Sequence, residues 1–291
     1  MITLNKESKI ILSRKGVDSS SGGFASPVII GKKMMSIPIP IPKGAKTLHD
    51  TGYNVKYKDI VFKDFSDKNY EDIINDLGQM NKLSEKYCDN GRCHLDPDIV
   101  QVDSKAKGWK PSFGQDDSAN AQTYLANQRE KAGLKSGDLF LFFGWFREAE
   151  EKDGKLSYKK LKQDDDYYFK GDGFHAIWGY LQIGEIIIGN KAGIKIDQEK
   201  IDKYCWHPHA NVNWKNNTLY IPTEKLSING DETALPGYGV FDFAEELILS
   251  EKKQNKSVWT NGFDHNKGHR QEKVIDCIDK NLDWVKKIFK L

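Results

Sequence analysis

Two long apolar runs constrain the fold of this chain more than any other feature of its sequence. Residues 138–146 (DLFLFFGWF) are almost continuously apolar, and residues 174–188 (FHAIWGYLQIGEIII) form a second such run. A run of this kind predicts a strand that is buried on both faces of a sheet. Gly179 and Gly184 interrupt the second run, as expected where a strand bulges and the sheet curls. The two runs therefore predict a curved sheet at the centre of the molecule.

Shorter strands are predicted at residues 217–221 and within residues 29–41. Apolar residues at helical spacing predict helices over residues 70–87 and 272–289, and a Ser N-cap with a following glycine predicts a third over residues 118–132. Strict alternation of strands and helices is absent, which argues against a doubly wound parallel fold. We therefore expect an α+β fold with a curved, mostly antiparallel sheet and flanking helices.

The most polar block of the chain, residues 148–170, separates the two apolar runs. It contains Lys159, Lys160 and Lys162, followed by three aspartates. Charge runs usually lie in solvent, so we expect an exposed insertion or hairpin loop there. No repeat or low-complexity linker divides residues 1–291, which we interpret as one domain.

Composition excludes several classes of protein. The 291 residues contain 44 basic and 42 acidic side chains, and the net charge of +2 neither favours nor excludes a nucleic acid. Four cysteines in a chain of this length do not make a disulfide framework. A membrane span would need about 18 apolar residues in a row, which are absent, and the first residues do not resemble a signal peptide. We therefore expect a cytoplasmic protein.

The strongest candidate binding site follows a short apolar run at residues 10–12. Residues 13–23 (SRKGVDSSSGG) place two cations, a carboxylate, hydroxyls and glycines in one loop. Glycines let the backbone approach a ligand, and N–H groups with cations suit phosphate. The loop matches neither a Walker A loop nor a dinucleotide-binding motif, and a flexible surface turn is the alternative. The predicted substrate-binding residues here are Arg14, Lys15, Ser19, Ser20, Gly22 and Gly23, and Asp18 is a predicted catalytic residue.

A second candidate site is the segment 93–98 (CHLDPD). In an extended segment His94, Asp96 and Asp98 would share one side, because successive side chains alternate. A histidine and two carboxylates so placed could bind a divalent metal or supply acid–base groups. Pro97 favours a turn instead, in which aspartates have structural roles. Both interpretations stay open.

The segment 108–115 (GWKPSFGQ) leads into the helix predicted from residue 118. A loop that ends at a helix N-terminus is a natural anion site, and the amide of Gln115 could read a base edge. Trp109 could stack on a base or sugar, although packing is the commoner fate of tryptophan. An ordinary loop with buried aromatic residues is the alternative.

Arg147 ends the first apolar run, and Asp172 and His175 flank the start of the second. A guanidinium group at the mouth of a buried strand needs a carboxylate partner or an anionic ligand, so a salt bridge and a substrate contact both explain Arg147. If the second strand returns to the same end of the sheet, His175 is the histidine expected to face Arg147.

The last cluster lies in residues 206–217 (WHPHANVNWKNN). His207 and His209 are spaced as two zinc ligands could be, but a third ligand would have to come from His175, His94 or Cys205. No paired-cysteine or HExxH motif accompanies them, so acid–base or hydrogen-bonding roles are favoured and no metal ligand is assigned. Asn217 is a candidate substrate contact.

Taken together, the motifs resemble the third nucleotide modification associated domain family. The resemblance rests on motifs that follow one another from about Leu12 to Ile221: SRKGVDSSSGGFASPV, SIPIP, CHLDPDI, GWKPSFGQ, GDLFLFFGWFR, HAIWGYLQIGEI, HPHA and NNTLY. The rhythm of the strands is also similar to that of PUA-like, ASCH and EVE-type barrels, which bind RNA or modified bases. The family resemblance implies a role in systems that alter bases in DNA, often in phages and other mobile elements. It implies no particular reaction, cofactor or catalytic residue.

Two functions of different classes compete. The first is an enzyme that modifies a nucleotide or a base, with DNA as the expected partner, by group transfer or glycosidic-type hydrolysis. An aspartate would act as base or stabilise a positively charged sugar, and a histidine would move protons. The second is a non-catalytic reader of modified bases. The many ionisable residues favour the enzyme, whose predicted catalytic residues are Asp18, His94, Asp96, Asp98, His175 and His207.

The candidate motifs are expected to converge on one cleft. For this to hold, the loop of Arg14 must lie within about 15 Å of Arg147 or His94, because extended side chains reach only a few residues' length. The sequence indicates neither a cofactor nor an oligomeric state.

Overall fold

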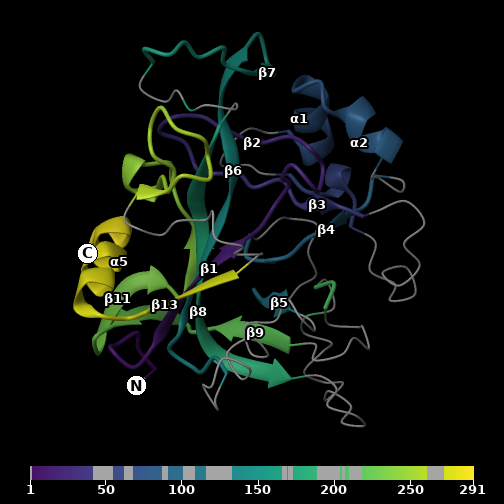
Figure 1. Cartoon of the computed structure of the whole chain (residues 1–291). Coiled ribbons are helices and arrows are strands. Elements are labelled where there is room, and N and C mark those ends of the chain that lie inside the picture. Colours follow the sequence, from purple (N-terminus) through teal and green to yellow (C-terminus); the bar gives the residue numbers. More distant parts are fainter. Residues whose placement is uncertain are drawn as a thin grey trace.

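Strands β6 (Leu139–Lys152) and β8 (Phe174–Ile188) run antiparallel through the middle of the molecule (Figure 1). They correspond to the two apolar runs, and six consecutive residues of β6 from Leu139 onward are buried, as a strand covered on both faces requires. The structure is a computed structural model. It describes residues 2–41, 55–61, 68–86, 91–100, 109–115, 133–165, 169, 173–188, 204, 207–209, 218–260 and 272–291.

Nine strands of the described residues form one sheet around this pair. The order along its main path is β13 (Glu272–Asp276), β1 (Lys9–Arg14), β6, β8, β9 (Thr218–Pro222) and β5 (Phe113–Gln115). Off this path, β8 also pairs with β12 (Tyr238–Val240), and β6 also pairs with β2 (Ser26–Val28) and β7 (Lys155–Tyr158). Only β1 and β2 run parallel to β6. The sheet curls into a half-barrel, which confirms the predicted α+β fold with a curved, mostly antiparallel sheet.

The glycines of β8 mark the two places where its pairing shifts. Gly179 lies opposite Phe142 of β6, and the next pair is Ile177 with Phe143. Trp178 therefore has no opposite residue in β6 and bulges from β8. A second shift lies at Gly184, within the part of β8 that pairs with β9. Bulges increase the local twist of a strand, and these two contribute to the curl of the sheet.

Short elements pack around the sheet. Two small sheets pair β3 (Ile39–Pro40) with β4 (Cys93–His94), and β10 (Lys225–Ile228) with β11 (Asp231–Pro236). The helical elements described are α1 (Tyr70–Asp76), α2 (Met80–Lys86), α5 (Asp279–Phe289) and the 3-10 turns η1 (Tyr57–Asp59) and η3 (Glu245–Leu247). β9 confirms the strand predicted over residues 217–221, whereas most of residues 29–38 are irregular.

The helix predicted over residues 70–87 is two helices, α1 and α2. Asn69 caps α1 by accepting a hydrogen bond from the Asp72 amide at 2.9 Å. The break contains Gly78, whose φ of +66° lies in the left-handed region that a right-handed helix excludes. Residues of both helices enter one hydrophobic cluster, so the apolar spacing continues across the break and predicts a single helix. The helix predicted over residues 118–132 lies outside the described residues.

The helix predicted over residues 272–289 begins only at Asp279. Residues 272–276 form β13, which pairs antiparallel with β1. The β-branched residues Val274 and Ile275 favour a strand, and the open edge of β1 supplies backbone hydrogen-bond partners. The helical remainder, α5, buries its apolar face as predicted.

The polar block at residues 148–170 begins as a hairpin, which was one of the two expected forms. β6 continues to Lys152, turns at Asp153 and Gly154, and returns as β7. The block is not wholly exposed, because Glu148 is buried and paired with Lys159.

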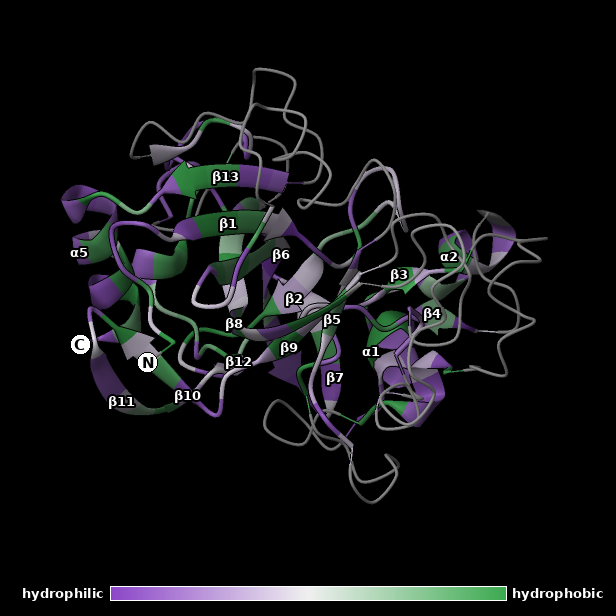
Figure 2. Ribbon diagram, turned by 90° about the horizontal axis from the view of Figure 1, so that it is seen from below, coloured by the Kyte–Doolittle hydropathy of each residue, from purple (hydrophilic) through white to green (hydrophobic). Residues whose placement is uncertain are grey.

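The core covers both faces of the β6–β8 pair. On one face, Phe140 and Phe142 pack edge-on against Phe113 of β5, with ring centroids 4.7 and 5.0 Å apart. On the other, Tyr180 of β8 packs edge-on against Phe289 of α5. Figure 2 shows that β1 and β6 are largely hydrophobic, whereas β11 is largely hydrophilic. A second hydrophobic cluster joins α1, α2 and β7 to the segment that follows β1.

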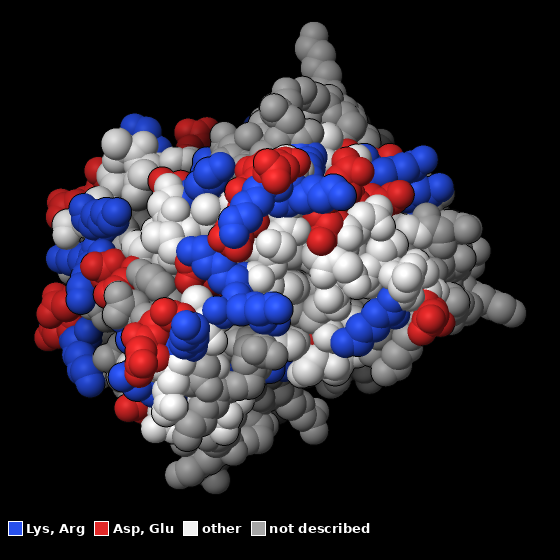
Figure 3. Space-filling view, turned by 90° about the horizontal axis from the view of Figure 1, so that it is seen from above, with Lys and Arg blue, Asp and Glu red and all other residues white. Residues whose placement is uncertain are grey.

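Acidic and basic side chains are mixed on the surface. On the face in Figure 3, Lys and Arg side chains lie among Asp and Glu side chains, in agreement with the net charge of +2. None of the helices in the described part of the chain has the length and apolar character that a membrane crossing needs.

Candidate functional site

Lys15 comes directly after β1, where the chain leaves the sheet. Its amide donates a hydrogen bond to the Phe143 carbonyl at 2.8 Å, which holds the residue against β6. The side chain passes over Phe113, with Nζ 4.2 Å from the ring centroid, and ends 3.3 Å from Asp96 Oδ2. Only 13% of the side chain is exposed. This ammonium group is therefore surrounded mainly by protein atoms.

Asp96 has partners at both carboxylate oxygens. Oδ1 accepts from the Gly114 amide and bonds to His207 Nε2, each at 2.9 Å, while Oδ2 faces Lys15. Burial alone would raise the pKa of Asp96, but the Lys15 ammonium and the hydrogen bond with His207 outweigh burial and hold the pKa well below its usual range. Asp96 thus supplies a permanent negative charge.

Hydrogen bonds at both ring nitrogens fix His207. Nδ1 accepts from the His209 amide at 3.1 Å, so the ring hydrogen lies on Nε2 and is donated to Asp96. The side chain has no exposed surface. Because both nitrogens are occupied, His207 orients Asp96 and is poorly placed for the proton transfer predicted from the sequence.

The rings of His94 and His209 lie beside Asp96 and His207. They meet edge-on with centroids 5.5 Å apart, and the His209 ring is 5.5 Å from that of His207. Burial lowers the pKa of His94 to about 4, against the opposing effect of the Asp96 carboxylate. His94 is therefore neutral at physiological pH.

Glu272, the first residue of β13, also belongs to this site, although the sequence gives no direct sign of it. Oε1 accepts hydrogen bonds from Ser13 Oγ and Gln115 Nε2, each at 2.6 Å. The other oxygen, Oε2, is buried and has no hydrogen-bond partner. Burial raises the pKa of Glu272 to about 7, against the effect of Lys15. Its carboxyl group thus exchanges a proton near neutral pH.

We call these side chains the buried charge cluster: Lys15, His94, Asp96, His207, His209 and Glu272, with Ser13 and Gln115 as hydrogen-bond partners. They come from five separate segments of the chain, which the folded sheet brings together. Within the residues that the structure describes, no group of three or more His, Cys, Asp or Glu side chains is arranged to hold a metal ion. The sequence predicts that the loop after β1 lies close to the segment 93–98. The contact between Lys15 and Asp96 places them side by side.

The loop at residues 18–23 is largely closed by its own aspartate. Asp18 Oδ1 accepts hydrogen bonds from the amides of Ser20 and Ser21 and from the Ser20 hydroxyl, each at 2.7 Å, and Oδ2 lies 3.4 Å from Arg14 Nε. Gly23 donates its amide hydrogen to the Asp18 carbonyl. These are N–H groups that a phosphate would need. Asp18 therefore takes the place of the anion that the sequence predicts for this loop.

Gly22 and Ser19, the other glycine and serine of this loop, differ in exposure. Gly22 is buried against Val17, which itself lies in the second hydrophobic cluster, whereas Ser19 is exposed. The loop is thus anchored by packing, in contrast to the flexible turn that was the alternative.

Asp98 and Trp109 bind each other outside the cluster. The Trp109 indole Nε1 donates to Asp98 Oδ2 at 2.8 Å, and the backbone of Asp98 pairs with that of Ser112. Asp98 is only 1% exposed. Pro97 lies between Asp98 and Asp96 in the chain, and the Asp98 carboxylate is directed to Trp109.

His175 and Arg147 lie among partners of their own. His175 is buried, and its Nδ1 accepts from Trp259 Nε1 at 3.1 Å. The Arg147 guanidinium lies 4.8 Å from the Tyr158 ring centroid, and its Nη2 is 3.5 Å from the Lys159 carbonyl. Within the described part of the chain, these contacts lie outside the buried charge cluster. Asn217, Asp172 and Cys205 lie outside the described residues.

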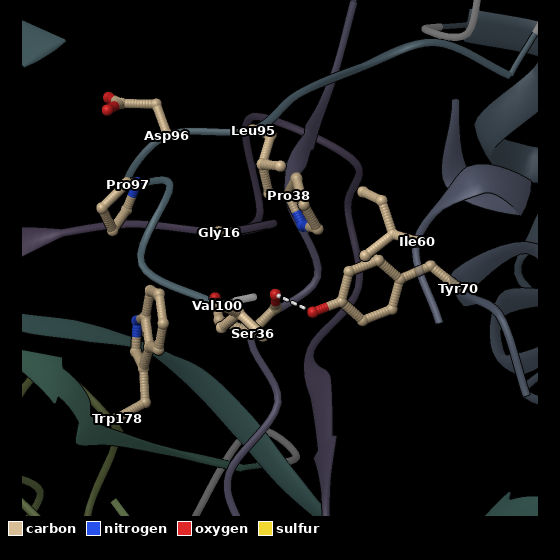
Figure 4. Close-up of a pocket in the computed structure, with 10 residues that line it drawn as sticks. All are labelled: Gly16, Ser36, Pro38, Ile60, Tyr70, Leu95, Asp96, Pro97, Val100 and Trp178. Atoms are coloured by element: carbon tan, nitrogen blue, oxygen red, sulfur yellow. Dashed lines mark hydrogen bonds between the residues drawn. The ribbon is translucent and has the colours of Figure 1, made fainter. Parts of the chain in front are cut away.

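A small pocket lies next to the cluster, on the other side of the segment 95–97 (Figure 4). Trp178, Pro97 and Tyr70 contribute to its walls, and the Asp96 carboxylate points away from it. Its volume of about 30 Å³ is room for one or two water molecules.

One protein family has a model that matches this chain. The family is described as nucleotide modification associated domain 3, and the match covers residues 9–286, which include the whole buried charge cluster. It is the family that the sequence motifs resemble. No curated protein and no solved structure matches the chain.

Proposed function

The chain belongs to the nucleotide modification associated domain 3 family, and on that basis we propose that it is an enzyme that modifies nucleotides or nucleobases at the buried charge cluster. The observation that carries this proposal is the fixed ammonium group of Lys15 beside the ionised Asp96. Charged groups that are oriented before the substrate arrives stabilise charge in a transition state without further reorganisation.

Lys15 is the residue we propose to contact the substrate first. An ammonium group has three N–H donors, and one of them is directed to Asp96. The others can bind a phosphate oxygen, or the negative charge that develops on a base or a leaving group. In this proposal Lys15 binds the anion, and the loop at residues 18–23 does not.

Asp96 and His94 have supporting roles in this proposal. Asp96 keeps Lys15 charged and in place, and its own position depends on Gly114 and His207. His94, which is neutral at physiological pH, can accept a hydrogen bond from the substrate. Group transfer and glycosidic-type hydrolysis both fit this set of residues, and DNA is the target we propose to examine first.

The reader of modified bases is the weaker candidate. A reader binds a base in a mostly apolar pocket with a few polar groups, and it needs no group that exchanges a proton. Trp109, the tryptophan predicted to stack on a base, uses its indole N–H to bind Asp98. The enzyme is favoured because the buried groups at the site are charged.

The test is nucleoside mass spectrometry of total DNA and RNA from cells that express the protein. We expect a nucleoside that appears or disappears with the wild-type chain and is unchanged from uninduced cells with Lys15→Met. Lys225→Met is the matched control, because Lys225 is an exposed lysine paired with Glu232 on the β10–β11 hairpin. Thermal unfolding of each purified variant checks that it is folded. Identical nucleoside profiles for the wild type and Lys15→Met would contradict the proposal.

A further inference from the structure

One oxygen of Glu272 is an exception to the rule that buried polar atoms are paired. Among the described residues, the buried side-chain atoms without a hydrogen-bond partner are Ser112 Oγ, Trp178 Nε1 and Glu272 Oε2. An unpaired buried polar atom costs about 1–3 kcal/mol, so each such atom in a folded protein calls for an explanation. Glu272 is the ionisable one of the three, and it belongs to the buried charge cluster.

We propose that Glu272 is the proton donor of the site, and that its Oε2–H group gives its proton to a heteroatom of a nucleobase. This inference rests on the proposed function and adds to it the catalytic residue and the atom class of the substrate that it contacts. The unpaired oxygen is the place where the substrate atom completes the hydrogen bonding.

The hydrogen bonds at the other oxygen decide where the proton lies. Oε1 accepts from Ser13 of β1 and from Gln115 of β5, two donors on different strands. Two donors at 2.6 Å fill the lone pairs of Oε1 and leave Oε2 as the oxygen that carries the proton. In the neutral carboxyl group, the Oε2–H group is then the one donor. Its direction is set by the hydrogen bonds from Ser13 and Gln115 to Oε1.

The charges around Glu272 allow both of its protonation states. Burial favours the neutral acid and raises the pKa to about 7, and the Asp96 carboxylate acts in the same direction. The Lys15 ammonium and the hydrogen bonds from Ser13 and Gln115 favour the carboxylate. An acid whose pKa lies near the working pH is the most effective proton donor, since it gives up its proton and regains it readily.

The proposed step is a single proton transfer. The O–H bond at Oε2 breaks, its electron pair stays on the carboxylate, and the proton forms a bond to a lone pair on a ring nitrogen or carbonyl oxygen of the base. Protonation makes the base a better leaving group or a better electrophile, which serves glycosidic-type hydrolysis and group transfer alike. Ser13, Gln115 and Lys15 stabilise the carboxylate until water returns the proton.

Glu272→Gln tests this role. Glutamine can accept the bonds of Ser13 and Gln115 and can donate an N–H group, but it has no proton to transfer. We expect product formation from genomic DNA, total RNA or the common nucleoside monophosphates, whichever the wild type converts, to fall about 100-fold or more. Wild-type activity should fall as the pH rises through about 7, because Glu272 loses its proton there. The residual activity of Glu272→Gln should show no such fall.

Asp276→Asn is the matched control, since Asp276 is an exposed carboxylate on the same strand, paired with Lys9. It should retain wild-type product formation. Infrared spectra of the purified protein supply a second readout that needs no substrate. The wild type should lose a protonated carboxyl band between pH 5 and pH 9 that Glu272→Gln lacks at both pH values.

The outcomes separate this inference from the proposed function. A folded wild-type protein that converts none of these substrates contradicts the proposed function, and the role of Glu272 fails with it. A wild type that forms a product, while Glu272→Gln forms it at the same rate and with the same pH dependence, contradicts the role of Glu272 alone. Infrared spectra in which no carboxyl band distinguishes the two proteins also contradict it.

Discussion

At the scale of single residues, the cluster is organised by two carboxyl groups in opposite protonation states. Asp96 has partners at both oxygens and remains ionised. Glu272 has donors at one oxygen only, and its pKa of about 7 means that it holds a proton at lower pH. When neighbouring titratable groups have pKa values that differ in this way, their environments assign them different roles. Asp96 is the fixed charge and Glu272 is the group that exchanges a proton.

The raised pKa of Glu272 also predicts how stability depends on pH. The folded protein holds this proton up to about pH 7, whereas the unfolded chain loses it near 4.5. Between these values only the unfolded chain is ionised at this residue, so the stabilisation due to Glu272 is complete below about pH 4.5 and is lost as the pH rises through 7. Relative to the wild type, Glu272→Gln should gain free energy of unfolding from pH 4.5 to pH 8, by on the order of 2–3 kcal/mol.

Urea unfolding of both proteins at a series of pH values measures this difference. Asp276→Asn serves again as the control and should show no comparable change with pH, because its carboxylate is exposed. A constant difference between Glu272→Gln and the wild type over this range would mean that the carboxyl group is not held protonated in the folded state.

Part of the site is predictable from the sequence. Lys15, His94, Asp96, Gln115 and His209 were all selected from the sequence, and the fold brings them together. Chemical type was the useful signal, because charged and imidazole groups next to apolar strands need partners. The same signal selects side chains whose contacts lie outside the cluster, among them Asp18, Asp98, His175 and Arg147. Only tertiary contacts distinguish these two cases.

At the scale of elements, the main difference between sequence and structure concerns residues 272–276. A helical pattern and a strand pattern both fit an apolar pair such as Val274 and Ile275. The free edge of β1 decides between them, and it is formed by residues far away in the sequence. Glu272 therefore could not be found from local pattern, since its position opposite Ser13 exists only when β13 pairs with β1.

Strand β5 packs closely against the His209 ring at Gly114, and this contact can be tested by substitution. A Cβ atom at Gly114 would lie 2.4 Å from His209 Cγ, closer than real contacts allow. Gly114→Ala should therefore push His209 away or displace the Gly114 amide from Asp96, and we expect a loss of about 1–3 kcal/mol in the free energy of unfolding. Chemical denaturation measures the loss.

Ser112→Ala is the control for this change on the same segment of chain. The Ser112 hydroxyl is buried without a hydrogen-bond partner, so its removal should leave stability nearly unchanged or raise it. If Gly114→Ala unfolds at the denaturant concentration of the wild type, the close packing between β5 and His209 is not essential to the site.

At the scale of the whole molecule, the half-barrel explains how distant segments form one site. The order β13–β1–β6 puts Glu272 beside Ser13, and β5 reaches the same place at the other end of the sheet path through Gln115. A flat sheet would separate β13 and β5 by the strands between them, whereas a curled sheet lets them meet. The two apolar runs and the bulges at Gly179 and Gly184 were predictable, but this meeting depends on the register of the whole sheet.

Hydrogen–deuterium exchange of the purified wild-type protein, with and without nucleic acid and nucleotides, tests most sharply whether the buried charge cluster receives the substrate. The additions are a single-stranded DNA oligonucleotide, an RNA oligonucleotide and a mixture of the common nucleoside monophosphates. We predict that at least one of them slows exchange in the peptides that cover residues 13–16, 93–98 and 113–115. Slower exchange confined to the β6–β7 hairpin, or to the loop at residues 18–23, would contradict the claim that the buried charge cluster receives the substrate.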